Sequence, residues 1–113
     1  MTDFCAGVGK VVSEVWNADI GYIGYGVTAE QWTERIARAN RFAEDLVTAS
    51  TEELRPTAER LRDAVAGLTA PPSAPDSPTK YDIVEPIFRQ INQGAGGCVA
   101  NGTEVGILAE FGG

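Results

Sequence analysis

Apolar residues recur every three or four positions through the middle of the chain, which is the spacing of one face of an α-helix. In the first of these stretches, the stripe consists of Trp32, Ile36, Ala39, Ala43 and Leu46. Thr28 is positioned to cap the start, and Gln31, three residues later, completes a capping-box pattern. The pattern predicts a helix over residues 29–49.

A second stripe follows after almost no link, and it consists of Leu54, Ala58, Leu61, Val65 and Leu68. Ser50 and Glu53 match another capping box, so we expect this helix over residues 51–69. Pro56 lies either within its first turn or at the start of the helix proper, with Leu54 then packing from the link. Because so short a link forces the second helix back along the first, the two should form an antiparallel hairpin.

Shorter apolar stripes predict one further helix near each end of the chain. The first helix is expected over residues 3–18 and the last over residues 78–93, with Ser77 and Pro78 as its start and a kink at Pro86. A proline-rich linker, residues 71–77, precedes the last helix. We therefore predict an all-α fold, a four-helix bundle that forms a single domain over residues 1–113.

Two glycine-rich segments interrupt this pattern. Residues 19–27 contain three glycines and two tyrosines, and we expect them to form an aromatic loop. The glycine-rich tail, residues 98–113, is compatible with a hairpin at Asn101-Gly102 or with a helical turn around Cys98 followed by an extended segment packed on the bundle. We favour the second arrangement, because a lone hairpin has no sheet to join.

The apolar stripes also predict which side chains form the core. The expected core residues are Phe4, Val8, Val11, Val15, Trp32, Ile36, Phe42, Leu46, Leu61, Val65, Leu68, Val84, Phe88 and Ile91.

Composition narrows the function classes. The chain has 113 residues, a formal net charge of −7 and no histidine. Such an acidic protein should avoid nucleic acid, and it lacks the commonest general base and metal ligand. No apolar run is long enough to cross a membrane. We therefore expect no catalytic residues, no metal, no cofactor and no membrane-spanning segment, and a protein as the partner.

The two cysteines, Cys5 and Cys98, lie near opposite ends of the chain. An even number of cysteines in these positions favours a disulfide, and hence an oxidising compartment, over two buried free thiols in the cytoplasm. The chain begins with Met1-Thr2-Asp3 and shows no secretory signal, so an extracytoplasmic location requires a leader that precedes this sequence.

The tyrosines of the glycine-rich loop, Tyr22 and Tyr25, are the candidate partner contacts. Glycines allow a close backbone approach, and tyrosines supply rigid contact area that is partly polar. The alternative is that they cover the end of the bundle as a lid, which we expect of at least one of them.

Two resemblances bear on the function. The segment from Tyr81 to Glu85 matches the Tyr-x-x-x-Asp/Glu signal of helical-hairpin substrates of actinobacterial type VII secretion, although the usual Trp-x-Gly turn is replaced by Ala49-Ser50-Thr51. The opening Asp3-Phe4-Cys5, the alanine-rich hairpin with Pro56, and the late Cys98 resemble small exported, lipoprotein-like domains of actinobacteria. That resemblance implies secretion and no particular activity.

Two functions remain open from the sequence. The first is a non-enzymatic, extracytoplasmic binding domain that uses the tyrosine loop or a groove between helices. The second is a cytosolic or phage-encoded structural interaction protein, or a type VII substrate. In the cytosolic or phage-encoded case, the cysteines stay reduced and the acidic ends of the chain contact a basic partner.

Overall fold

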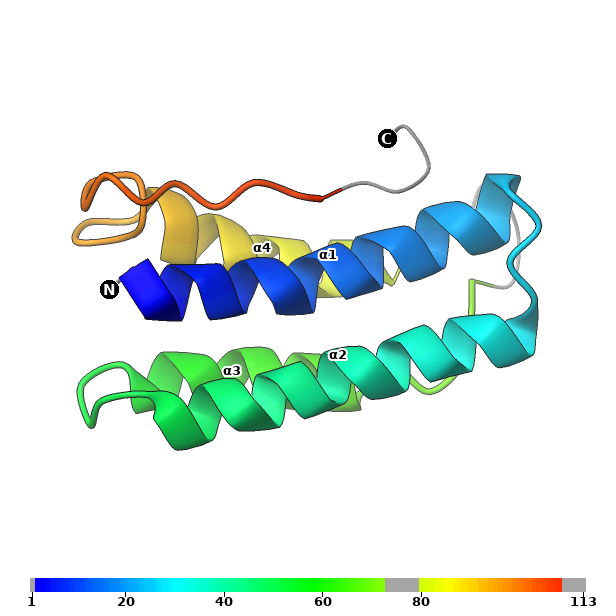
Figure 1. The fold of residues 1–113 in the computed structure, drawn as a ribbon, viewed down its shortest axis with the longest axis horizontal. Helices are drawn as coiled ribbons and strands as arrows, with labels where there is room; N and C mark the ends of the chain where they lie inside the picture. Colours follow the sequence, from blue (N-terminus) through cyan, green and yellow to red (C-terminus); the bar gives the residue numbers. More distant parts are fainter. Residues whose placement is uncertain (1, 73–79, 109–113) are drawn as a thin grey trace.

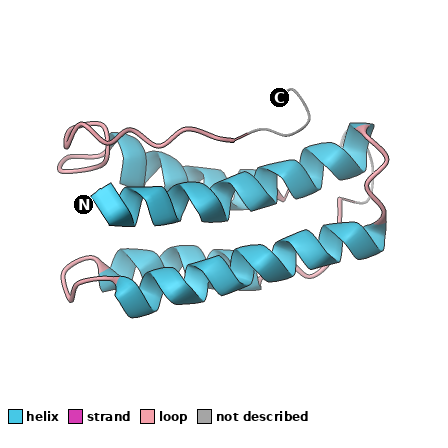
Figure 2. Ribbon diagram, viewed as in Figure 1, coloured by secondary structure: helices cyan, strands magenta, loops and turns pink. Residues whose placement is uncertain are grey.

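The computed structural model describes residues 2–72 and 80–108, and within them the chain forms four helices and no strand (Figures 1 and 2). The helices are α1 (Thr2–Gly24), α2 (Ala29–Ala49), α3 (Arg55–Ala66) and α4 (Tyr81–Gln93). All four lie along the longest dimension of a body that measures 38 × 24 × 20 Å. The main contacts join α1 to α2, α2 to α3, α3 to α4 and α4 to α1. The predicted all-α class and helical bundle are confirmed.

The apolar stripes of the four helices meet in one core. Every predicted core residue except Phe42 and Phe88 is buried, and these two phenylalanines are half-buried against the edge of the core. Small side chains complete the interior, because Ala18, Ala39, Ala43 and Ala58 are fully buried. Because alanine is small, the larger residues of the stripes can pack around these positions.

The first helix is longer than predicted, and the loop expected over residues 19–27 is largely helical. Helix α1 continues to Gly24 because its inward face extends past residue 18, with Ala18, Asp19 and Gly21 all buried. Glycine costs a helix about 1 kcal/mol relative to alanine, and here the packing of the inward face offsets that cost. Only residues 25–28 link α1 to α2.

Helix α2 has the predicted bounds, and its predicted capping box is present. The Thr28 hydroxyl accepts a hydrogen bond from the Gln31 backbone N–H at 3.1 Å. The Gln31 side chain in turn accepts one from the Thr28 backbone N–H at 2.9 Å. Together these bonds satisfy donors that the start of a helix otherwise leaves without partners.

Helix α3 is shorter than predicted, and the capping box expected at Ser50 does not form. Ser50 instead ends α2, where its buried hydroxyl donates to the Leu46 carbonyl. Regular helix begins only at Arg55, because Pro56 lacks an N–H and is best accommodated in a first turn. At the other end the helix stops at Ala66, although Leu68 is still buried.

Helix α4 begins at Tyr81, with Lys80 at its N-cap position and Pro86 inside it. The start predicted at Ser77-Pro78 and residues 73–77 of the predicted linker lie outside the described residues. The kink expected at Pro86 stays a prediction.

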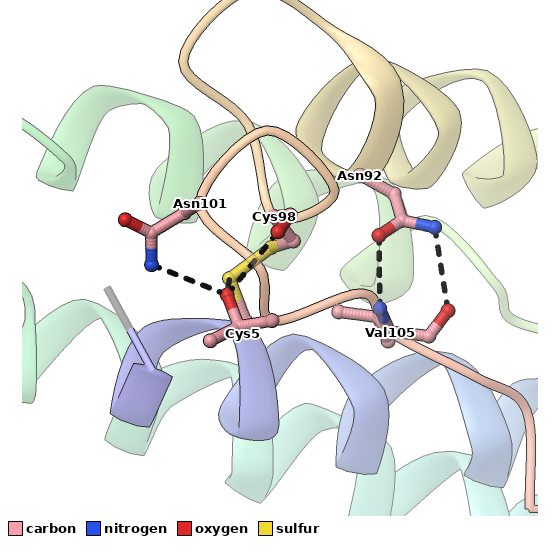
Figure 3. The surroundings of a disulfide bond; sticks show 6 residues. Cys5, Asn92, Cys98, Asn101 and Val105 are labelled. Carbon is pink, nitrogen blue, oxygen red and sulfur yellow. Dashed lines mark hydrogen bonds between the residues drawn. A yellow bond between two sulfur atoms is a disulfide. The ribbon is translucent and has the colours of Figure 1, made fainter.

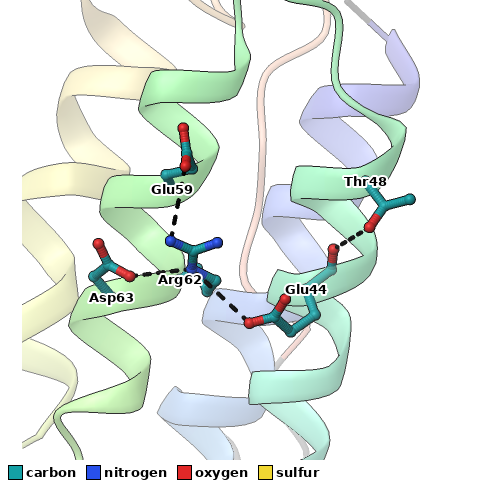
Figure 4. A network of polar contacts seen from close by, with 5 residues as sticks. All are labelled: Glu44, Thr48, Glu59, Arg62 and Asp63. Atoms are coloured by element: carbon teal, nitrogen blue, oxygen red, sulfur yellow. Dashed lines mark hydrogen bonds and ion pairs between the residues drawn. The ribbon is translucent and has the colours of Figure 1, made fainter.

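A group of charged side chains joins α3 to α2 on the surface (Figure 4). The Nε atom of Arg62 on α3 lies 3.0 Å from Asp63 Oδ1 and 3.9 Å from Oε1 of Glu44 on α2. Its Nη2 atom lies 3.8 Å from Glu59 Oε2. Glu44 and Asp63 are largely exposed and Glu59 is about half exposed, so these pairs contribute little individually to stability. Their main consequence is that one guanidinium is surrounded by acids from both helices.

After α4 the chain makes a series of turns through residue 102 and then extends over residues 103–108. The turns carry Cys98 to Cys5 of α1, and the extended segment, red in Figure 1, follows α1 in the same direction. We call residues 103–108 the tail segment.

Candidate functional site

A hollow of about 460 Å³ lies where α1 passes into α2. The residues that line it are Tyr25, Gly26, Val27, Gln31, Glu34, Arg35 and Arg38. One wall is the short link after α1, and the other is the outward face of the first turns of α2. We call this region the link hollow.

The two candidate tyrosines have different environments. Tyr22 lies on the last turns of α1 and is half-buried against the core. Tyr25 follows the helix, is 58% exposed and lines the link hollow. The expectation that at least one tyrosine covers the end of the bundle fits Tyr22, whereas only Tyr25 has the exposure that a partner contact needs.

The sequence of the link explains why it adopts a fixed turn. Gly26 has a φ of 78°, a left-handed conformation that costs glycine almost nothing. This turn allows the N–H groups of both Tyr25 and Val27 to donate to the Gly21 carbonyl, at 2.9 and 3.1 Å. The capping box of α2 begins immediately afterwards. Both sides of the link hollow are therefore held by backbone hydrogen bonds.

The link hollow presents polar groups of both signs. Arg35 and Arg38 contribute guanidinium groups, Glu34 a carboxylate and Gln31 a carboxamide. Arg38 also reaches α1, where its Nη1 lies 3.2 Å from Glu14 Oε1. Such a surface can form hydrogen bonds with a polar partner around the exposed tyrosine ring.

A buried carboxylate lies at the same end of the bundle, and sequence reasoning missed it by placing Asp19 in a loop. Asp19 is fully buried and accepts hydrogen bonds from Trp32 Nε1 at 2.9 Å and from the Tyr81 backbone N–H at 2.6 Å. Burial raises the pKa of its carboxyl above the ordinary value of 3.8, more than these hydrogen bonds lower it. The signal in the sequence was the helical spacing, since Asp19 lies four residues after Val15.

An aromatic pair packs beside this carboxylate. The rings of Trp16 and Tyr81 meet edge to face with their centroids 4.9 Å apart. The buried Trp16 Nε1 has no hydrogen-bond partner among the described residues. The first residue of the Tyr-x-x-x-Glu match is thus half-buried in the structure and packs against α1.

The predicted pair of cysteines lies at the opposite end of α1. The Sγ atoms of Cys5 and Cys98 are 2.07 Å apart and form a disulfide, and their Cα atoms are 6.0 Å apart. Both side chains are buried, and the Thr103 hydroxyl donates to Cys5 Sγ at 3.3 Å. Figure 3 shows the two cysteines and their surroundings. The bond joins residues 93 positions apart in the sequence.

The part of the chain that the structure describes contains no cluster of three or more histidine, cysteine, aspartate or glutamate side chains arranged to hold a metal ion. Among these same residues, no helix combines the length and the apolar character that crossing a membrane requires.

No protein-family model, no curated protein and no solved structure matches this chain.

Proposed function

We propose that this protein is a non-enzymatic, extracytoplasmic binding domain whose partner contacts the link hollow through Tyr25. The observation that carries the proposal is the contrast between the two tyrosines. Tyr22 packs against the core, whereas Tyr25 is 58% exposed on a link that backbone hydrogen bonds hold in place. An exposed tyrosine on a rigid segment loses little conformational entropy on binding, and tyrosine is enriched at protein interfaces.

Binding accounts for the groups in the link hollow better than catalysis does. The chain has no histidine, and the carboxylate and guanidinium groups lie on the outer face of α2 around an open hollow. They surround the tyrosine as a polar rim surrounds the centre of an interface. In this proposal the scaffold that carries them is the antiparallel hairpin of α2 and α3.

The disulfide supports the extracytoplasmic part of the proposal. Disulfides persist in oxidising compartments and are rare in the cytoplasm, and this one closes a long loop. A secreted domain of this kind agrees with the resemblance to small exported actinobacterial domains. Expression of the gene with its own upstream sequence, followed by fractionation, tests the location. Accumulation in the cytoplasm with two free thiols would contradict it.

The binding site is tested by capture experiments with single variants. Immobilised wild-type protein and a Tyr25→Ala variant are exposed to secreted and surface proteins of the source cells, and bound proteins are identified by mass spectrometry. We expect one partner to be captured by the wild type and lost from Tyr25→Ala. Val99→Ala, which shortens an exposed apolar residue in the turns after α4, is the matched control and should retain capture. Equal capture by all three proteins would refute the site.

A further inference from the structure

Buried side chains of α1 and α4 bind the main chain of the tail segment. Asn92 of α4 bonds both backbone groups of one residue, since its Oδ1 accepts from the Val105 N–H at 2.9 Å and its Nδ2 donates to the Val105 carbonyl at 3.3 Å (Figure 3). Asn92 is only 4% exposed. A carboxamide placed in this way replaces the hydrogen bonds that a neighbouring β-strand would supply.

Helix α1 repeats this arrangement three residues farther along the tail segment. The Ser13 hydroxyl accepts from the Leu108 N–H at 3.0 Å, and Asn17 Nδ2 donates to the Leu108 carbonyl at 2.9 Å. Ser13 and Asn17 are 6% and 3% exposed, and they lie on one face of α1 because they are four residues apart. Three residues of extended chain span about 10 Å. The groove between α1 and α4 is therefore lined with groups that recognise extended backbone.

Only one side chain of the tail segment is deeply buried in this groove. Val105 is 8% exposed, whereas Leu108 is 77% exposed. A side chain at Gly9 would bring its Cβ to within 3.3 Å of Val105 Cγ1, so the glycine allows the valine to approach α1 closely. Recognition of main-chain groups plus one side-chain pocket is how proteins bind extended peptides of limited sequence specificity.

No covalent bond holds the tail segment in the groove. The disulfide ends at Cys98, and the turns that follow include Gly102, whose φ of 79° is left-handed. Beyond these turns the segment is held by the hydrogen bonds described above, by those of Thr103, by the packing of Val105 and by the partly buried Ile107. Residues 99–102 can therefore act as a hinge without disturbing the disulfide.

We propose that the groove between α1 and α4 is a binding site for an extended polypeptide, and that the tail segment of a second copy can replace the chain's own to give a tail-exchanged dimer. A second copy offers the same Val105 and the same free backbone groups in the same register, so every contact of the closed form can form between two chains. Because each copy carries a net charge of −7, repulsion opposes the exchange, and added salt should favour it.

A labelled peptide with the sequence of residues 102–108 tests the groove directly. Fluorescence anisotropy measures its binding to the full-length wild type and to a Val105→Asp variant. In this variant the chain's own tail segment binds the groove more weakly, and the residues of α1 and α4 that line the groove are unchanged. We expect the variant to bind the peptide about tenfold more tightly than the wild type or better. The same peptide with aspartate in place of its valine, and the double variant Val105→Asp with Asn92→Leu, should show no binding.

Peptide that binds neither the wild type nor a folded Val105→Asp variant would overturn the binding site. If that variant does not fold, amide hydrogen exchange of the wild type tests whether the tail segment detaches from the groove. Local release of the segment should let the Val105 and Leu108 amides exchange sooner than the Val11 and Val12 amides of α1. Exchange of all four amides only on global unfolding would overturn the proposal. Light scattering tests whether the tail segment of a second copy occupies the groove. A dimer fraction that increases with protein concentration and salt supports the tail-exchanged dimer. A protein that binds the peptide but stays monomeric excludes that dimer.

Discussion

The carboxylate of Asp19 on α1 accepts a hydrogen bond from the indole N–H of Trp32 on α2, and both side chains are buried. The same carboxylate accepts the backbone N–H of Tyr81, the first residue of α4. One side chain thus joins three helices at a single end of the bundle, and it caps the start of α4 from a different helix.

Removal of this carboxylate should destabilise the fold. In Asp19→Ala, the Trp32 indole N–H stays buried and the Tyr81 backbone N–H partly buried, both without this partner, and each lost partner costs about 1–3 kcal/mol. Urea unfolding should therefore show a fall in the free energy of unfolding of several kcal/mol. A double-mutant cycle with Trp32→Phe should give a positive coupling energy, and strictly additive effects would contradict the bond.

The same carboxyl should give the stability a characteristic pH dependence. Burial raises the pKa of Asp19 above 3.8, so the folded protein binds this proton more tightly than the unfolded chain does. The contribution of the group to stability is therefore complete below its unfolded pKa and is lost as the pH rises through the folded pKa.

An Asp19→Asn variant isolates this contribution, because it does not titrate. The free energy of unfolding of the wild type minus that of Asp19→Asn should increase as the pH falls from neutral to about 4. Urea titrations at a series of pH values measure the difference. A difference that decreases on acidification would mean that the pKa is lowered in the folded state.

The disulfide should supply a large part of the total stability. A loop closed by residues 93 positions apart corresponds to about 4–5 kcal/mol in the chain-entropy model. The double variant Cys5→Ser with Cys98→Ser should lose about that amount in denaturant unfolding. Mass spectrometry of unreduced wild-type protein should find no free thiol, and the detection of two thiols in oxidised material would contradict the bond.

The two tyrosines should differ in what their truncation costs. Tyr25→Ala should change the free energy of unfolding by less than about 0.5 kcal/mol, because the side chain is mostly exposed. Tyr22→Ala removes a half-buried ring and should cost more, but less than the 3–5 kcal/mol or so typical of fully buried aromatic residues. Thermal unfolding of both variants compares them, and equal costs would argue against different roles.

Two glycines provide a matched test of the turn that positions Cys98. A Cβ at Gly97 would clash with the Ile91 carbonyl oxygen, so Gly97→Ala must displace the backbone next to the disulfide. A Cβ at Gly24, at the end of α1, would meet nothing within 4 Å. We expect Gly97→Ala to destabilise clearly and Gly24→Ala to be neutral or to stabilise by up to about 1 kcal/mol. Similar melting temperatures for the two variants would refute this account of Gly97.

The sequence predicted what depends on apolar spacing. The bounds of α2 followed from the stripe that begins at Trp32 and from the capping box at Thr28, and most of the core followed from the apolar stripes of the four helices. The pairing of Cys5 with Cys98 followed because the chain contains no other cysteine. The helix bounds depend on residues close together in the sequence, and two cysteines can pair in only one way. Both can therefore be predicted without knowing how the helices pack.

The remaining features depend on contacts between distant segments. Three glycines and an aspartate near residue 19 indicated a loop, yet burial against Trp32 and Tyr81 keeps that stretch helical. Ser50 matched a capping pattern in sequence but bonds backward to Leu46. The sequence does not single out Asn92, because its hydrogen bonds are made to the tail segment. No hydrophobic periodicity predicts where that segment lies.

The bond between Cys5 and Cys98 also determines how the molecule would respond to mechanical force. Tension applied to the two ends of the chain passes from one cysteine to the other through a covalent bond, so the 92 residues between them bear none of it. The force acts only on the residues outside the two cysteines, which are the few before Cys5 and the segment beyond Cys98. Beyond Cys98, the hydrogen bonds of Asn92, Ser13 and Asn17 to the tail segment oppose it. A molecule pulled from its ends would therefore release its tail segment while the part of the bundle between the two cysteines stays packed.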